Sequence, residues 1–267
     1  MHTPHRIEDG RKFRIASLSP NPPKNAPSKP DGIRATETLL PRLYALQEKL
    51  FADGRKGLLI VLQAMDTGGK DGTVQHVFSG VNPMGCRVTS FKAPTPEELR
   101  HPFLWRATNA LPPRGSIGIF NRSHYEDVLV VRVHDLVPKP VWSRRYSQIN
   151  EWERMLTEDG YVVLKFFLHI GRDEQKERLQ ARLDDPAKRW KFEPADLAER
   201  KHWDDYMKAY QDVIRKCSTP WAPWVVVPSN RKWYRNLVVA SAIVDALQKL
   251  DLKLPEPDFD PSAIRIE

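Results

Sequence analysis

Runs of apolar residues along the chain predict five buried strands. The clearest begins at residue 57, where GLLIVL gives six residues without a charge. An uninterrupted run of this length is typical of a strand buried on both faces of a parallel sheet. The strongest β signal, VVLKFFLHI, covers residues 162–170. The other predicted strands cover residues 86–91, 117–120 and 225–227.

Between these strands, apolar residues recur every three or four positions, which is the spacing of an amphipathic helix. Leu39, Leu43 and Leu50 repeat in this way within residues 35–52. Further helices are predicted from about residue 73 and over residues 96–109 (with Leu99 inward), 138–157, 173–183, 194–217 and 233–250. Strands that alternate with helices indicate an α/β fold with three α/β/α layers and a parallel sheet of five strands.

Both ends of the chain depart from this alternation. Residues 1–35 are polar and rich in proline, so we expect an extended arm with little structure of its own. Residues 251–267 form a proline-rich, acidic tail. We therefore expect one folded domain over residues 36–250.

Composition and charge limit the classes to which the protein could belong. A chain of 267 residues with 40% hydrophobic and 28% charged residues is typical of a globular protein. Its net charge of +8 favours a polyanionic partner, which could be nucleic acid, membrane headgroups or a polyphosphorylated substrate. No apolar run is long enough to span a bilayer, and the N-terminus lacks the apolar core of a signal peptide. Cys86 and Cys217 match no metal or redox spacing, so we expect a cytoplasmic location.

A glycine-rich loop, DTGGKDG from Asp66 to Gly72, follows the strand that begins at residue 57. Glycines let backbone N–H groups converge on an anion, the following helix adds its dipole, and Lys70 adds a full charge. Ala64 and Asp71 break the strict phosphate-loop pattern, which has a glycine and a hydroxyl there. Asp66 would repel phosphate unless a divalent cation lay between them, so it indicates a metal ligand. The alternative is a plain turn between strand and helix.

A second polar cluster, NRSHYED at residues 121–127, follows a short apolar strand. Open α/β sheets place their chemistry at the carboxyl ends of their strands. Glu126 and Asp127 could therefore hold magnesium together with Asp66. Asp127 could instead cap a helix, and we give His124 no catalytic role.

Several arginines could clamp phosphates, because the planar guanidinium suits pairs of oxygens. The candidates are Arg122, Arg132, Arg178, Arg182 and Arg189. Arg178 and Arg182 lie one helical turn apart and would present a double cationic face. Arg178 could alternatively pair with Glu174 on an exposed helix face.

Taken together, these motifs resemble polyphosphate kinase family 2, which comprises P-loop kinases that exchange phosphate between inorganic polyphosphate and nucleotides. The resemblance covers about residues 45–247. It rests on QAMDTGGKDG at 63–72, GVNP at 80–83, NRSHYEDV at 121–128, RLQAR at 178–182 and DPAKRWKF at 185–192. Many members have DRSWYN where this chain has NRSHYE. The carboxylate has thus moved from position 121 to 126, which resembles the subgroup called class III, whose members phosphorylate nucleoside mono- and diphosphates.

The resemblance implies a fold similar to thymidylate kinase, a helical lid over about residues 172–195, magnesium dependence and a homo-oligomer, either a dimer or a tetramer. The expected catalytic residues are Asp66, Lys70, Arg122, Glu126 and Asp127, with Asp66, Glu126 and Asp127 as metal ligands. Nucleotide and phosphate contacts are expected from Thr67, Gly68, Gly69, Asp71, Gly72, Thr73, Asn82, Asn121 and Arg132. Lid contacts to polyphosphate are expected from Arg178, Arg182, Lys188 and Arg189.

The sequence therefore predicts a polyphosphate-dependent nucleotide kinase that passes a terminal phosphoryl group to AMP or ADP, reversibly and with magnesium. An ATP-dependent nucleotide or small-metabolite kinase on the same fold is the alternative. A nucleic-acid-binding P-loop protein ranks last, because the aromatic residues lie mostly at core spacing and not along a basic groove. We expect neither nucleic acid nor membrane as a partner.

Overall fold

The predicted parallel sheet is present and has one additional strand. In the computed structural model, which describes residues 6–266, the strands pair in the order β1-β6-β5-β2-β4-β3. Neighbours from β6 to β3 are parallel, whereas β1 is antiparallel to β6. The strands are β1 (Arg6–Ile7), β2 (Gly57–Gln63), β3 (Cys86–Ser90), β4 (Ile117–Asn121), β5 (Tyr161–His169) and β6 (Trp224–Pro228).

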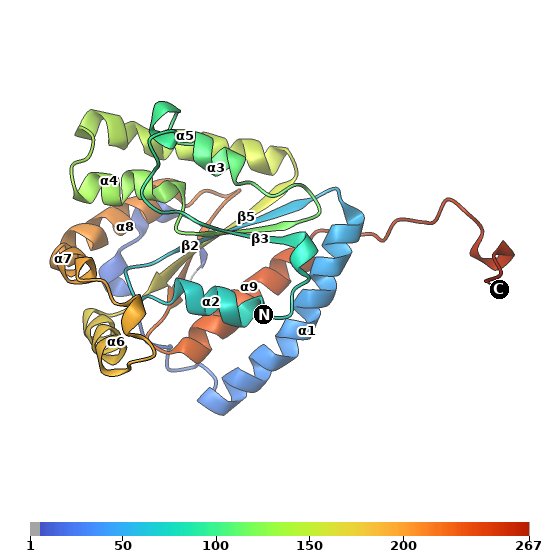
Figure 1. Cartoon of the computed structure of the whole chain (residues 1–267), viewed down its shortest axis with the longest axis horizontal. Coiled ribbons are helices and arrows are strands. Elements are labelled where there is room, and N and C mark those ends of the chain that lie inside the picture. The colour runs from blue at the N-terminus through green and yellow to red at the C-terminus, as the bar shows by residue number, and fades with distance from the viewer. Residues whose placement is uncertain (1–5, 267) are drawn as a thin grey trace.

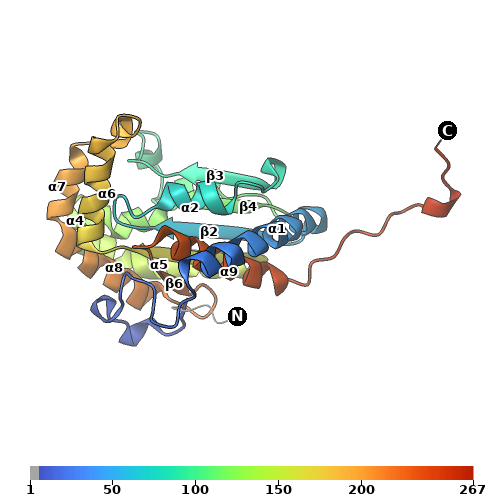
Figure 2. The same cartoon turned by 90° about the horizontal axis from the view of Figure 1, so that it is seen from below.

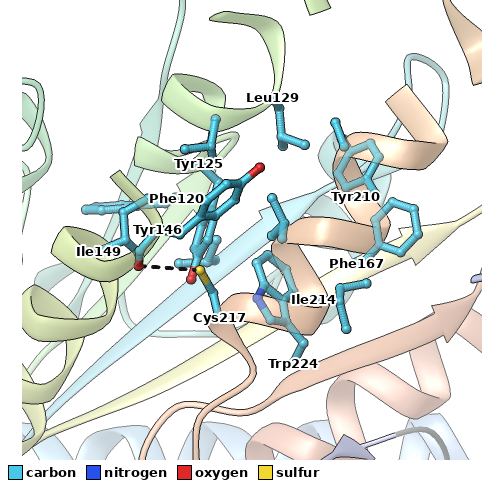
Figure 3. Close-up of a cluster of buried hydrophobic side chains, with 14 of the residues drawn as sticks. Phe120, Tyr125, Leu129, Tyr146, Ile149, Phe167, Tyr210, Ile214, Cys217 and Trp224 are labelled. Carbon is cyan, nitrogen blue, oxygen red and sulfur yellow. Dashed lines mark hydrogen bonds between the residues drawn. The ribbon is translucent and has the colours of Figure 1, made fainter. Parts of the chain in front are cut away.

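Helices cover both faces of the sheet (Figures 1 and 2). One core, between the sheet and helices α1, α2 and α9, includes the fully buried Leu43, Ile60 and Ile243. The other core lies on the side of α5 and α8 and holds the aromatic cluster around Tyr125 and Trp224 (Figure 3). The helices are α1 (Lys29–Asp53), α2 (Lys70–Val77), α3 (Trp105–Asn109), α4 (Val130–Val133), α5 (Lys139–Glu158), α6 (Arg172–Asp184), α7 (Ala195–Lys201), α8 (Trp203–Cys217) and α9 (Lys232–Gln248).

The helix predicted over residues 96–109 is wrong. The segment contains only a short 3-10 helix, η4 (Glu98–Arg100), and α3. Pro102 lies between them, and a proline removes a backbone donor and disfavours helical geometry in the residue before it. Leu99, which we expected to point inward, is 70% exposed.

Two other helices differ from the prediction in their bounds. α1 begins at Lys29, well before residue 35, because the Ser28 hydroxyl caps it by accepting a hydrogen bond from the Asp31 N–H. The helix predicted over residues 194–217 is interrupted at His202, which separates α7 from α8.

The N-terminal arm is irregular but packed, so the expectation of little structure is wrong for the segment before α1 that the structure describes. β1 pairs with β6, and Phe13 and Ile15 are buried. Gly10 lies so close to α8 that a Cβ atom there would overlap the Ile214 carbonyl. Residues 1–5 of the predicted arm lie outside the described residues.

The tail after α9 extends away from the domain (Figure 1). Leu252 is buried, and the tail beyond it, as far as residue 266, is exposed. Along residues 6–266, no helix is both long and apolar enough to cross a membrane.

Candidate active site

The loop between β2 and α2 has the backbone geometry of an anion cradle. All of β2 is buried, which fixes the start of the loop. Thr67 and Gly69 adopt left-handed backbone conformations, with φ of 59° and 101°, so the chain turns sharply before α2. A Cβ atom on Gly69 would also overlap the Arg235 guanidinium. The residues predicted to contact phosphate in this part of the chain lie in this loop and in the first turn of α2. They are Thr67, Gly68, Gly69, Asp71, Gly72 and Thr73.

The Lys70 ammonium folds back across the loop. Its Nζ donates to the Ala64 carbonyl oxygen at 3.1 Å. Burial and, secondly, the Arg122 guanidinium lower the pKa of Lys70, while Asp66 and Glu126 act in the opposite direction. An anion bound in the loop would favour the charged ammonium, which is the state that a phosphate site needs.

Asp66, Arg122 and Glu126 lie beside this lysine. Arg122 Nη2 donates to Asp66 Oδ1 at 2.9 Å. Arg122 has a φ of 60°, and its backbone N–H donates to the Leu62 carbonyl at 3.1 Å, which joins the turn after β4 to β2. Burial raises the pKa of Glu126, and Arg122 and Lys70 oppose that shift. The site therefore combines two carboxylates with two cations next to the anion loop.

Asp71 and Asn121, the two residues that depart from commoner motifs, contact each other. Asn121 Nδ2 donates to Asp71 Oδ1 at 2.6 Å. An aspartate at position 121 would place two carboxylates together and would cost repulsion. The neutral Asn121 amide instead donates a hydrogen bond to the Asp71 carboxylate.

The predicted set of three metal-binding carboxylates is not assembled. The Asp127 carboxylate turns toward α5 and α3, where it accepts from Arg145 Nη1 at 2.8 Å and lies 3.7 Å from Arg106 Nη2. Within the described part of the chain, no three Asp, Glu, His or Cys side chains gather closely enough to hold a metal ion. Asp127 adjoins Glu126 in sequence, but neighbours in a helical turn point in different directions.

The side chains of Arg132 and Asn82, which were predicted to contact nucleotide or phosphate, form contacts with other parts of the protein. Arg132 Nη1 donates to Asp212 Oδ2 at 2.8 Å, and its guanidinium lies 4.9 Å from the centre of the Trp142 ring. It therefore ties α4 to α8 and α5. Asn82 Oδ1 accepts from the Met84 N–H at 3.0 Å and caps a short 3-10 helix, so its side chain has a local structural role.

Arg178 connects the lid to the loop. Its Nε donates to Glu174 Oε1 at 2.8 Å, which is the pairing expected as the alternative to a phosphate contact. Its Nη1 also donates to the Thr67 carbonyl at 3.0 Å, and its Nη2 to the Ser229 carbonyl at 2.6 Å. Arg178 is thus adjacent to the anion site, but its charge is already paired.

The other lid cations form contacts within the lid. Arg182 contacts the Lys191 carbonyl and Asp196, Lys188 pairs with Asp185, and Arg189 donates to the Leu183 carbonyl. Arg178 and Arg182 therefore do not form the single exposed cationic face expected from their spacing.

Sequence reasoning missed two buried polar residues at the site. Gln63, the last residue of β2, donates from Nε2 to Ser123 Oγ at 3.0 Å, and its Oε1 has no hydrogen-bond partner among the described residues. Arg235 is buried on α9 against the loop. A signal existed for Arg235, because it shares the core-facing spacing of Val238, Val239 and Ala242.

A buried ionic network lies behind the turn that carries Glu126. Lys165 Nζ donates to Glu153 Oε2 at 2.5 Å and to Tyr125 Oη at 2.9 Å, and Tyr125 Oη donates to Glu153 Oε1 at 2.8 Å. Burial by itself raises the pKa of Glu153, but Lys165 and His124 together lower it below its ordinary value. Because Tyr125 directly precedes Glu126, this network fixes the position of the Glu126 backbone.

Comparisons with known proteins find matches in sequence and in overall fold. The sequence profile of the family described as Polyphosphate kinase 2 matches residues 27–255. The chain is 49% identical to an AMP/ADP-polyphosphate phosphotransferase from Meiothermus ruber over 98% of this chain and 99% of that protein. It is 43% identical to an ADP-polyphosphate phosphotransferase from Rhodopseudomonas palustris over 94% and 91% of the two chains. The crystal structure of polyphosphate kinase 2 from Arthrobacter aurescens superposes with a TM-score of 0.93 at 48% identity, covering 96% of this chain and 93% of that one.

Proposed function

This chain belongs to the polyphosphate kinase 2 family, and from that premise we propose that it transfers the terminal phosphoryl group of inorganic polyphosphate to AMP and to ADP, reversibly. The main support for the proposal is the arrangement of the anion loop, in which Lys70 and the start of α2 lie beside Asp66 and Arg122. The relatives named for AMP/ADP and for ADP support these two acceptors.

The residues of the site match what phosphoryl transfer requires. The transferred group passes through a loose transition state, so catalysis depends on placing donor and acceptor in line and on neutralising charge. The loop amides and Lys70 hold phosphate oxygens, and the fork of Arg122 is suited to the oxygens of the transferring group. The ion pair with Asp66 orients that fork before substrate arrives.

The oxygen atoms near the loop fit magnesium. Asp66 and Glu126 offer carboxylates, and Gln63 Oε1 and Thr67 Oγ1 are buried without a hydrogen-bond partner in residues 6–266. Magnesium prefers oxygen ligands and is usually held by one or two carboxylates plus substrate phosphates. When bound, it supplies positive charge to the phosphate oxygens. We propose Asp66 and Glu126 as its protein ligands.

One assay tests the proposed function. The full chain is incubated with magnesium, long-chain polyphosphate and either AMP or ADP, and the nucleotides are separated by chromatography. We expect ADP followed by ATP from AMP, and ATP from ADP, with both reactions stopped by chelation of magnesium. If ATP replaces polyphosphate as the effective donor to AMP, the chain is an ATP-dependent kinase and the proposal is wrong.

We expect the double change Arg178→Gln with Arg182→Gln to raise the KM for polyphosphate more than that for nucleotide. Every phosphate contact that the change removes should flatten the dependence of log KM on log salt by about 0.7–0.9. The control is Arg172→Gln with Lys176→Gln, which removes the same charge from exposed positions on the same helix. A salt slope equal to that of the control would mean that these arginines serve only the lid contacts seen in the structure.

The range of acceptors is expected to depend on Asn121 and Glu126. AMP carries one phosphate fewer than ADP, so the reacting oxygen lies one phosphate nearer the base. The change Asn121→Asp with Glu126→Asn moves the carboxylate next to Asp71 and should narrow the enzyme toward one acceptor. Initial rates with AMP and with ADP are measured for both forms, with Asn109→Asp plus Glu256→Asn as the surface control. An unchanged ratio of the two rates would contradict this role.

A further inference from the structure

A β-turn from Met65 to Gly68 holds the first part of the anion loop in a strained conformation. The Gly68 N–H donates to the Met65 carbonyl at 3.0 Å. Thr67, the third residue of the turn, has a φ of 59°, whereas Asp66 is not in the positive-φ region. This is the pattern of a type II turn, which favours glycine or asparagine at the third position. A β-branched threonine is strained there, so contacts from outside the turn must hold it.

The lid helix α6 supplies these contacts through two side chains. Gln175 Nε2 donates to the Asp66 carbonyl at 3.1 Å, and Arg178 Nη1 donates to the Thr67 carbonyl at 3.0 Å. Gln175 is 1% exposed, so its amide depends on protein partners and not on water. Both views of the fold place α6 at the same end of the sheet as the start of α2 (Figures 1 and 2).

The direction of the Gln175 amide is fixed from α7. Arg200 Nη1 donates to Gln175 Oε1 at 2.7 Å. A guanidinium offers only donors, so the amide oxygen must face Arg200 and the amide nitrogen must face the Asp66 carbonyl. α7 is tied to the domain beside this arginine, because Glu199 Oε2 accepts from Tyr206 Oη on α8 at 2.7 Å.

We infer that Gln175 is a positioning residue, which sets the direction of the Asp66–Thr67 peptide and so turns the Thr67 N–H toward phosphate. This inference rests on the proposed function. The C=O and N–H of a trans peptide point in opposite directions, so the bond from Gln175 directs the Thr67 N–H away from α6.

Loss of the Gln175 bond would let this peptide rotate. A type I turn relieves the strain, because its third residue has a negative φ. The Asp66 carbonyl oxygen would then replace the Thr67 N–H on the phosphate-binding side and would repel the anion. The lid helix thus holds the anion loop in its binding form through a residue that itself touches no substrate.

The test compares Gln175→Met with the unaltered full chain, each with and without Thr67→Gly. Glycine adopts a positive φ without strain and keeps the N–H, so it should hold the type II turn without Gln175. Gln180→Met is the matched control, because Gln180 lies on the exposed face of α6 and bonds to Asp184. For each protein we measure kcat, the KM for polyphosphate and the KM for AMP. Binding of sodium pyrophosphate is measured by calorimetry without acceptor.

We expect Gln175→Met to lower kcat/KM for polyphosphate about 10–100-fold and to weaken pyrophosphate binding, while the KM for AMP does not change. In the Thr67→Gly background, the same change should cost several-fold less. A purely structural role would give equal losses in both backgrounds, because glycine at position 67 cannot restore a general loss of stability.

Equal losses in the two backgrounds, or no loss in folded Gln175→Met, would therefore overturn the inference. If Gln175→Met does not fold, Arg200→Met takes its place in the same comparison, since it removes the group that orients the Gln175 amide. If the unaltered chain shows no transfer from polyphosphate, the proposed function fails. Pyrophosphate binding by the same four proteins then still decides whether Gln175 holds the loop.

Discussion

Replacing Lys70 with alanine is expected to lower kcat by about 10²–10³-fold while the fold remains intact. The part-buried Lys70 ammonium lies across the anion loop and donates to the Ala64 carbonyl, so we expect it to face, in the substrate complex, the oxygens on which charge develops. Removal of one contact of this kind typically costs about 2.7–4 kcal/mol of transition-state stabilisation. Asp66→Asn should have a similar effect, because it removes a proposed metal ligand and the partner of Arg122.

Steady-state rates at saturating magnesium and polyphosphate provide the measurement, with circular dichroism and Tm to confirm folding. The control is Lys208→Ala, which removes an exposed lysine from α8. Near-wild-type turnover of either Lys70→Ala or Asp66→Asn would show that the loop is not the phosphate site. If Lys70→Ala loses turnover because it unfolds, Asp66→Asn becomes the deciding variant, because it replaces only one carboxylate oxygen with an amide nitrogen.

Replacing Lys165 with methionine is expected to have the largest effect on stability. Lys165 and Glu153 are fully buried and bond to each other at 2.5 Å. Removing one partner of a buried pair leaves an uncompensated charge and costs about 3–5 kcal/mol. For a chain of this size, the Tm should fall by on the order of 10 °C.

The double variant Lys165→Met with Glu153→Leu separates the charge effect from simple loss of packing. It should be less destabilised than Lys165→Met alone, because no buried charge remains unpaired. Lys208→Met, which disrupts the exposed Lys208–Asp205 pair, should cost only about 0–1 kcal/mol. Chemical denaturation of the four proteins tests this order, and a double variant less stable than the single one would contradict it.

The strands and the anion loop could be predicted from the sequence because each depends on neighbouring residues. The run from Leu58 to Leu62 is apolar at every position, which is enough to predict a strand buried on both faces. Gly68, Gly69 and Lys70 form the anion loop through their own backbone geometry and charge. The pairing of Arg178 with Glu174, which the sequence offered as the alternative to a phosphate contact, was accessible for the same reason, since the two residues lie one helical turn apart.

The assignment of individual side chains to the site depended on the tertiary structure. Asp127 and Arg132 lie in or next to the polar segment predicted to be catalytic, but Arg145 on α5 and Asp212 on α8 hold them away from the loop. Conversely, Arg235 is far from the loop in sequence and reaches it only because α9 packs against α2. Hydrophobic period and local motif describe how a segment folds with its neighbours. The partner of a charged side chain is set by which distant elements the folded sheet brings together, and the sequence pattern contains no direct record of that contact.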